Sequence, residues 1–217
     1  IEKYLDIFSN YGFKYSGHLN YLIDLNENID TIWKNVFSKR KNEIRKGLKE
    51  NITVSEINYE KENYLSYCLL KSVYSKARLP LPDFEYFESA GRIMFNDNIL
   101  KIFGGYYDGI LISVIYLLCY NGRVYNWYAA GNHEYYSKYP NDVTMWEAIK
   151  WAKENGFEIF DFGGAGHPEK KYGVRDFKKK FGGREVNFGR FELIHKPFIM
   201  KVSGYGFRAW QKLKLYI

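Results

Sequence analysis

The sequence predicts one α/β (α+β) domain in which a mixed β-sheet is flanked by helices. Hydrophobic residues make up 46% of the 217 residues, which is enough to build a core. Three strand-like segments follow one another over residues 99–131, joined by the hairpin signals Asp108-Gly109 and Asn121-Gly122. Segments with helical periodicity stand on both sides of these strands, as a sheet covered by helices requires.

The N-terminal part predicts two helices and two strands. Residues 1–10 have a helical pattern, and "HLNYLIDL" at residues 18–25 is typical of a strand. We expect Asp30 to cap the next helix, whose apolar residues recur through Leu48. "ITVSEIN", residues 52–58, alternates like a strand.

The central part predicts helices before and after the three strands. Two helices are expected over about 63–78 and 83–95, because the prolines of the intervening "LPLP" interrupt a helix. After the strands, Pro140 begins a helix that Gly156 ends.

The C-terminal part predicts a strand, "FEIFDFGG" at 157–164, and a short basic helix over 175–180. A further strand, "REVNFGRFELIH", covers 184–195, and a basic helical tail begins at Pro197. From residue 52 the order is β-α-α-β-β-β-α-β-α-β, the succession of the GCN5-related N-acyltransferase (GNAT) fold. That fold has a mixed sheet splayed in the middle, where acyl donor and amine acceptor meet, so we expect a GNAT-like architecture.

The positive charge is concentrated in two short segments. Residues 38–50 hold six Lys/Arg against two Glu, and residues 169–185 hold seven Lys/Arg against three acids. Each segment therefore carries +4 of the net +7, and the rest of the chain sums to −1. This concentration favours a localised anionic partner over a generally basic surface.

The two cysteines predict neither a disulfide framework nor a metal site. Cys68 and Cys119 lie in apolar runs without CxxC or histidine spacing, which is typical of buried thiols in a reducing compartment. The apolar run "ILISVIYLLCY" is too short to span a bilayer, and no signal peptide is visible. We expect a cytoplasmic protein without a bound metal.

The first basic segment contains an arginine on an apolar helix face. Arg40 lies four residues before Ile44 and three after Phe37, with Lys41 at the margin of that face. A guanidinium in such a place requires an anion, so we expect Arg40 and Lys41, with Arg45 in the same segment, to bind substrate phosphate. The alternative is that the helix breaks at residue 38 and the whole run is a solvated surface.

The second basic segment pairs aromatic and cationic side chains. In "KYGVRDFKKKFGG", Phe177 and Phe181 are spaced to anchor one helix face, which places Lys178 at the edge of a pocket. We expect Lys179 and Lys180 to be more exposed. Arg175 in the same segment is a further candidate for substrate binding.

Several motifs together resemble the Fem family of peptidoglycan interpeptide-bridge aminoacyltransferases and their broader relatives. These are "IWKNVFSKRKNEIRKGLKE", "YPNDVTMWEAIKWAKENGFEIFDFGG" and "YGVRDFKKKFGG", in the family's order over about residues 29–195. Family members have two GNAT-like units. The resemblance therefore implies a remnant of a first unit at 1–28, an acyltransferase domain at 29–196 and a basic tail at 197–217.

The resemblance also implies a reaction and its residues. An amino acid would pass from aminoacyl-tRNA to the stem-peptide amine of a phosphorylated peptidoglycan precursor, nucleotide- or lipid-linked, without a bound cofactor. The family's "FK" pair falls on Phe177 and Lys178, and its phosphate-associated basic helix falls on Arg40 and Lys41. A lysine ammonium aimed at the ester carbonyl would stabilise the developing oxyanion. If the acceptor is lipid-linked, the basic tail is expected to contact anionic lipid.

Two carboxylates and two tyrosines are further candidates for the site. Asp161 and Asp108 are candidate bases for the amine, although a carboxylate at a strand end is as often structural. Tyr128 and Tyr136 border the expected cleft as candidate substrate-binding residues.

Two other functions compete with this reading. An acetyl-CoA-dependent N-acyltransferase acting on an amino sugar or peptide amine would cradle pyrophosphate in a glycine-rich loop. The corresponding loop here, "GNHEYYSKYPND", has no glycine after Gly131. A simple RNA-binding module is the second alternative, because basic patches interleaved with aromatic residues can stack bases.

Overall fold

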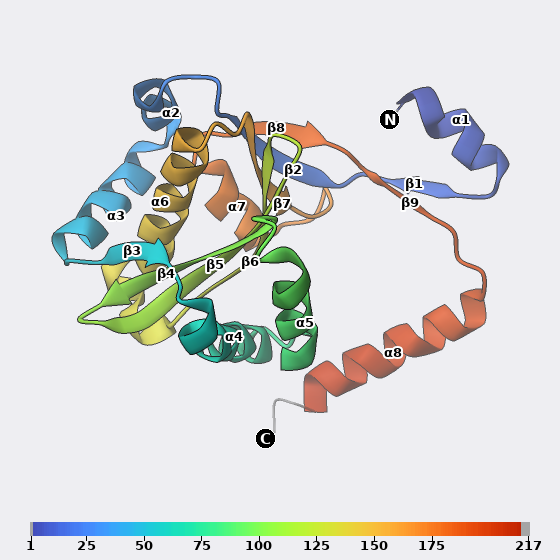
Figure 1. Cartoon of the computed structure of the whole chain (residues 1–217). Coiled ribbons are helices and arrows are strands. Elements are labelled where there is room, and N and C mark those ends of the chain that lie inside the picture. Colours follow the sequence, from blue (N-terminus) through green and yellow to red (C-terminus); the bar gives the residue numbers. More distant parts are fainter. Residues whose placement is uncertain (1, 214–217) are drawn as a thin grey trace.

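The predicted mixed sheet flanked by helices forms the centre of the chain (Figure 1). The computed structural model describes residues 2–213. Seven strands form one sheet in the order β3-β4-β5-β6-β7-β2-β8, and β1 and β9 form a separate two-stranded sheet. All neighbours in the large sheet are antiparallel except β6 and β7, which are parallel. The predicted fold class is confirmed.

The strands are β1 (Lys14–Ser16), β2 (Leu19–Asp24), β3 (Thr53–Glu56), β4 (Leu100–Tyr107), β5 (Ile110–Tyr120), β6 (Arg123–Gly131), β7 (Ile159–Gly164), β8 (Arg184–Asn187) and β9 (Arg190–Glu192). The helices are α1 (Glu2–Asn10), α2 (Ile29–Asn35), α3 (Ser38–Lys49), α4 (Tyr59–Lys76), α5 (Phe84–Met94), the 3₁₀ helix η1 (His133–Lys138), α6 (Pro140–Glu154), α7 (Gly173–Lys179) and α8 (Pro197–Leu213).

Both predicted hairpins are confirmed. Asp108 and Gly109 have φ of 48° and 75°, and Asn121 and Gly122 have φ of 48° and 71°. Two consecutive positive φ values define the type I′ turn, whose twist matches that of antiparallel strands. These turns set the register of β4, β5 and β6 next to each hairpin, and the register then shifts once in each ladder, between Gly105 and Tyr106 and between Tyr116 and Leu117.

Two predicted elements are wrong in their boundaries. The single helix expected from Asp30 to Leu48 is two helices, because Val36 and Phe37 adopt extended backbone between α2 and α3. Asn28, not Asp30, caps α2, since its Oδ1 accepts from the Thr31 N–H at 2.7 Å. The strand expected over 184–195 is divided into β8 and β9, and Gly189 between them has a φ of +64°.

Helices cover both faces of the sheet, and an apolar core lies under the helices of each face. On one face α6 packs on β4, β5 and β6, and α3 packs on α6. On the other face α4 packs on β5 and β6, next to α5 (Figure 1). Fully buried Ile149 belongs to the first core and fully buried Leu70 to the second.

The parallel pair β6–β7 is short, and this creates the splay of the sheet. Its register runs only from Arg123–Ile159 to Tyr125–Asp161. Beyond this point the last six residues of β6 continue without β7 as a partner. The edge of β6 that faces β7 is therefore free for other contacts.

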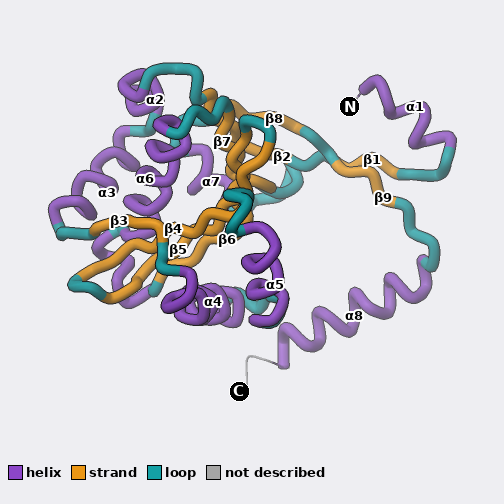
Figure 2. Tube along the Cα trace, viewed as in Figure 1, coloured by secondary structure: helices purple, strands orange, loops and turns teal. Residues whose placement is uncertain are grey.

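The predicted helical tail is present as α8, which stands away from the large sheet (Figure 2). No residue of α8 is buried, and the side-chain Nε2 of Gln211 donates to the Arg78 carbonyl at 3.0 Å. The tail was expected to reach residue 217, and residues 214–217 lie outside the described part. No helix within residues 2–213 is both long and apolar enough to cross a membrane. The domain boundaries at 28 and 196 stay predictions.

Candidate active site at the splay of the sheet

A cavity of about 530 Å³ lies where β6 and β7 part. Its walls come from α4, β5, β6, the first turns of α6, the end of β7, and α7. Aromatic side chains form much of the lining: Tyr74, Tyr125, Trp127, Tyr128, Tyr172 and Phe177. Among the described residues that line this cavity, Lys178 is the only one with a charged side chain.

Lys178 is 9% exposed, and its Nζ donates to the Gly164 carbonyl at 2.9 Å. Burial lowers the pKa of this lysine to about 8, and the Asp161 carboxylate acts in the opposite direction. A buried ammonium held by one carbonyl keeps hydrogens available for a ligand oxygen. The expected position of Lys178, at the edge of a pocket on a short helix, agrees with the structure.

Phe177 is half-buried beside Lys178 and joins the cavity to the first basic segment. Its ring lies 5.3 Å from the ring of Phe181, centroid to centroid. The guanidinium carbon of Arg40 lies 4.3 Å from the Phe177 ring centroid. This cation–π contact favours one placement of the Phe177 ring, and thus of α7.

Arg40 points inward, as its helix position predicts, and is 5% exposed. However, the anions that Arg40 contacts are carboxylates of this chain and not a substrate phosphate. Its Nη1 forms an ion pair with the buried Asp142 of α6 and lies 3.2 Å from a carboxylate oxygen of Glu43. The physical reason for expecting a substrate phosphate at Arg40 therefore no longer applies. The alternative, in which residues 38–50 form a solvated surface, is wrong for Arg40, which is buried. The helix is nevertheless interrupted just before Ser38, as that alternative expected.

Lys41 and Arg45 also do not reach the cavity. The Nζ of Lys41 donates to the Lys34 carbonyl at 2.9 Å, and the Arg45 guanidinium lies 5.5 Å from the Trp33 ring centroid. The two basic segments thus meet through the contact of Arg40 with Phe177, and not across an open cleft.

The candidate bases lie in different places. Asp161 is 9% exposed, and its Oδ1 accepts from the Gly163 N–H at 2.7 Å and from the Asn20 side chain at 2.9 Å. It does not line the cavity. Asp108 is exposed in the β4–β5 turn and does not line it either.

Of the three remaining predicted site residues, only one lines the cavity. Tyr128 lines the cavity, whereas Tyr136 is 47% exposed on η1 and does not. Arg175 has a structural role, since its guanidinium donates to the carbonyls of Ala165, His167 and Pro168 in the loop after β7.

Sequence reasoning missed two amides near the site. Asn20 of β2 is 8% exposed and bonds to Asp161. Asn126 of β6 lines the cavity, and its Oδ1 is buried without a hydrogen-bond partner in the described part of the chain. In both strands the only signal was a polar residue among apolar ones.

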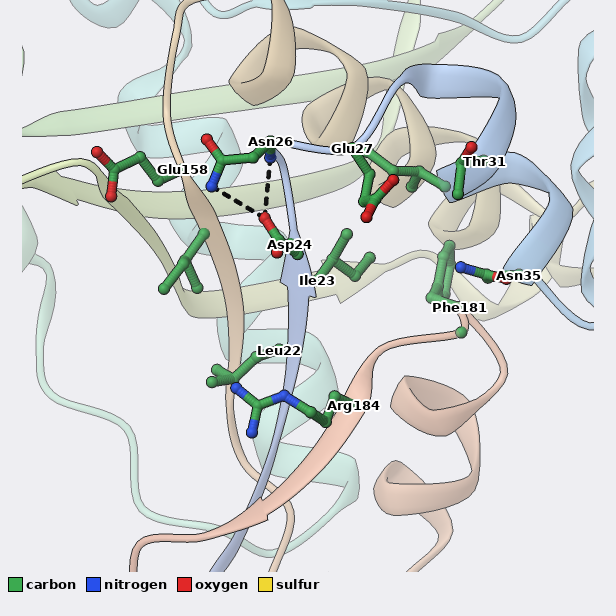
Figure 3. Close-up of a pocket in the computed structure, with 13 residues that line it drawn as sticks. Leu22, Ile23, Asp24, Asn26, Glu27, Thr31, Asn35, Glu158, Phe181 and Arg184 are labelled. Carbon is green, nitrogen blue, oxygen red and sulfur yellow. Dashed lines mark hydrogen bonds between the residues drawn. The ribbon is translucent and has the colours of Figure 1, made fainter.

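A second cavity of about 400 Å³ lies between β2, α2 and the turn after α7. Figure 3 shows Asp24 of β2, whose Oδ1 accepts from the backbone and side chain of Asn26, and Arg184 of β8, the strand that pairs with β2. None of the predicted site residues, all of which are described, lines it. The candidate active site is therefore the cavity at the splay.

A protein-family comparison decides the family. Residues 68–179, about half of the chain, match the acetyltransferase (GNAT) domain family. The chain belongs to this GNAT family. The matched region runs from α4 through α7 and so includes every element that lines the cavity.

Other comparisons place this GNAT domain near Fem proteins. A lipid II:glycine glycyltransferase of Staphylococcus haemolyticus is 30% identical over 90 residues, which are 40% of this chain and 22% of that protein. The match thus spans about a fifth of the length of this curated relative. The structure of FemX superposes with a TM-score of 0.75 at 17% identity, over 93% of this chain and 72% of FemX. The structure of L-PGS from Bacillus licheniformis superposes with a TM-score of 0.63 at 11% identity, over 92% of this chain and 67% of L-PGS. The prediction of a Fem-like GNAT acyltransferase domain is confirmed.

Proposed function

We propose that this GNAT domain transfers an amino acid from aminoacyl-tRNA to the stem-peptide amine of a phosphorylated, nucleotide- or lipid-linked peptidoglycan precursor. The observation that supports it most is the Lys178 ammonium in an aromatic-lined cavity whose other described lining residues carry no charge. The similarity to lipid II:glycine glycyltransferases supports the acceptor class. The proposed location is the cytoplasm, the compartment of the tRNA donor.

The chemistry follows from the residues around Lys178. As the amine attacks the ester carbonyl, negative charge develops on the carbonyl oxygen. An ammonium in a site with little water stabilises that charge more strongly than it stabilises the neutral ester. The new C–N bond forms first, and the ester C–O bond breaks when the tetrahedral adduct collapses. The proton that the attacking amine gives up passes to the ribose oxygen, so that the tRNA leaves as an alcohol.

A covalent enzyme intermediate is not needed in this scheme. Among the described residues that line the cavity, none is Ser, Cys, His, Asp or Glu. The Thr144 hydroxyl, which lines the cavity, hydrogen-bonds to the Ser113 hydroxyl at 2.6 Å and not to a base of the kind that acyl-enzyme mechanisms use. An aminoacyl ester is already activated for direct attack by an amine.

Acetyl-CoA transfer is the second candidate, because the matched family is named for acetyltransferases. The loop before α6 forms η1 and ends at Tyr139, which has a φ of +57°. The sequence of η1 contains no glycine, the residue that lets backbone N–H groups approach a pyrophosphate closely. This arrangement favours the tRNA donor over CoA.

The test is transfer of label to a defined acceptor. The protein is incubated with a nucleotide-linked or lipid-linked stem peptide and either aminoacyl-tRNA or acetyl-CoA, each with a labelled acyl group, and the products are measured by mass spectrometry. We expect label to arrive from aminoacyl-tRNA and to depend on Lys178. Label that arrives from acetyl-CoA alone would establish the second candidate instead.

We extend this proposal to peripheral membrane contact through α8. Lys201, Arg208 and Lys212 are spaced to share one side of the helix, and the sequence of α8 contains no acidic residue. Phe198 and Tyr205 are 78% and 67% exposed. A helix with exposed apolar and cationic side chains binds best to a surface of anionic lipid.

We expect the protein to sediment with phosphatidylglycerol-containing vesicles more than with neutral phosphatidylcholine vesicles. The triple variant Lys201→Glu, Arg208→Glu, Lys212→Glu should lose this preference. A triple variant that sediments with the anionic vesicles as wild type does would contradict the role of α8.

A further inference from the structure

The end of β7 contains an irregularity beside the Lys178 site. In the β2–β7 ladder Asn20 pairs with Gly164 and Leu22 pairs with Asp161, so β7 has one residue more than β2 over this stretch. Such an extra residue is a β-bulge, which re-aims the backbone that follows it. Gly163 lies in the bulge with a φ of +70°.

Glycine is required at this position for two reasons. A side chain at a φ of +70° would be strained. A Cβ atom would also lie 3.0 Å from the Asn126 carbonyl oxygen and 3.0 Å from the Tyr125 hydroxyl. The bulge is therefore packed against β6 at the point where the sheet opens.

Two buried side chains hold the bulge. The Oδ1 of Asp161 accepts from the Gly163 N–H at 2.7 Å and from the Nδ2 of Asn20 at 2.9 Å. Asp161 and Asn20 are 9% and 8% exposed, so these bonds are shielded from water. A carboxylate that accepts both bonds ties β7 to β2 at the bulge.

The bulge in turn positions the catalytic lysine. Gly164, the residue after Gly163, supplies the carbonyl that accepts from the Lys178 Nζ at 2.9 Å. Regular pairing then resumes, since the Ala165 N–H donates to the Leu19 carbonyl at 2.6 Å. Anything that moves the Gly163 N–H thus moves the oxygen that holds the ammonium.

We propose that Asn20 and Asp161 are positioning residues for the transfer reaction, acting through the Gly163–Gly164 bulge on the place and protonation of the Lys178 amine. In this proposal Asp161 is not the base that the sequence suggested, because it does not line the cavity and its Oδ1 accepts from Gly163 and Asn20. This inference rests on the proposed function of Lys178. It also explains why the neighbouring strands β2 and β7 bury a hydrogen-bonded pair of polar side chains, Asn20 and Asp161.

The charges around Lys178 agree with this role. Asp161 on β7 raises the pKa of Lys178 against the larger opposing effect of burial. His18, in the segment before β2, lies close enough to interact with the charge of Lys178. Burial lowers the pKa of His18, as do the charges of Arg190, Lys178 and His167, in that order. Removing the Asp161 charge should therefore lower the pKa of Lys178 further.

The first experiment needs no substrate. The pH dependence of Lys178 acylation by acetic anhydride is measured by peptide mass spectrometry in wild type, Asp161→Asn and Asp176→Asn. Asp161→Asn keeps the shape and an acceptor oxygen, and it removes the charge. We expect its labelling curve to move to lower pH, with several-fold faster labelling at pH 7. Asp176→Asn removes an exposed carboxylate of α7 and should leave the curve in place.

The second experiment separates kcat from KM. In Asn20→Ala, which removes the bond to Asp161, we expect kcat to fall about ten- to hundredfold with KM nearly unchanged, the effect of a misplaced catalytic group. Circular dichroism checks that the variant is folded. The inference is overturned if the labelling curve of Asp161→Asn matches wild type, or if Asp176→Asn moves it equally, or if folded Asn20→Ala keeps the wild-type kcat. If wild type shows no aminoacyl transfer, the proposed function fails, while the labelling experiment still tests the positioning of Lys178.

Discussion

Lys178→Met is expected to lower the rate of aminoacyl transfer about a hundred- to thousandfold, which corresponds to about 3–4 kcal/mol of transition-state stabilisation. Methionine has a similar length, but it places no charge beside the developing oxyanion. The interaction is gained only in the transition state, so kcat should fall and KM should change little. The measurement is single-turnover transfer to the peptidoglycan precursor, with exposed Lys179→Met as the matched control.

The pH dependence gives an independent check on the same lysine. Burial lowers the pKa of Lys178 to about 8, so the ammonium is present below that pH and is lost as pH rises through it. We expect wild-type kcat/KM to have a descending limb near pH 8. Lys178→Arg, which keeps its charge, should lack this limb even if its rate is lower. An unchanged rate in Lys178→Met, or the same limb in Lys178→Arg, would remove Lys178 from the mechanism.

Elements specified by local chemistry were predicted well from the sequence. The Asp-Gly and Asn-Gly turns determine their own backbone conformation, and Pro140 occupies the first turn of α6, as expected. The order of elements then gave the fold class, because few architectures accommodate that succession of strands and helices. The short helix that presents Phe177 and Lys178 was found for the same reason, since its aromatic spacing is local.

The partners of buried polar groups were not predictable, because they are distant in sequence. The helix pattern correctly placed Arg40 on an inward face, but nothing near it indicated that Asp142 would meet its charge. The role of Asp161 was likewise hidden, since Asn20 lies 141 residues away and the bulge between them has no sequence signal beyond Gly163. The sequence therefore showed which polar groups need a partner. It did not show that the anion for Arg40 is Asp142 of the same chain and not a substrate phosphate.

Arg40→Ala is therefore expected to destabilise the fold by about 3–5 kcal/mol, because it leaves the carboxylate of Asp142 buried and unpaired. The free energy of unfolding in urea measures this loss, and exposed Arg45→Ala should stay within about 0.5 kcal/mol of wild type.

The double variant Arg40→Met, Asp142→Leu removes both charges at similar volume and should recover most of that stability. Its transfer rate should remain below that of wild type, because Phe177 has lost the guanidinium that contacts its ring. An Arg40→Ala protein with wild-type stability that binds the phosphorylated precursor more weakly would instead assign Arg40 to the substrate. The two roles thus differ in a measurement that needs no activity, since an arginine that only bound the substrate would leave the stability of the fold unchanged.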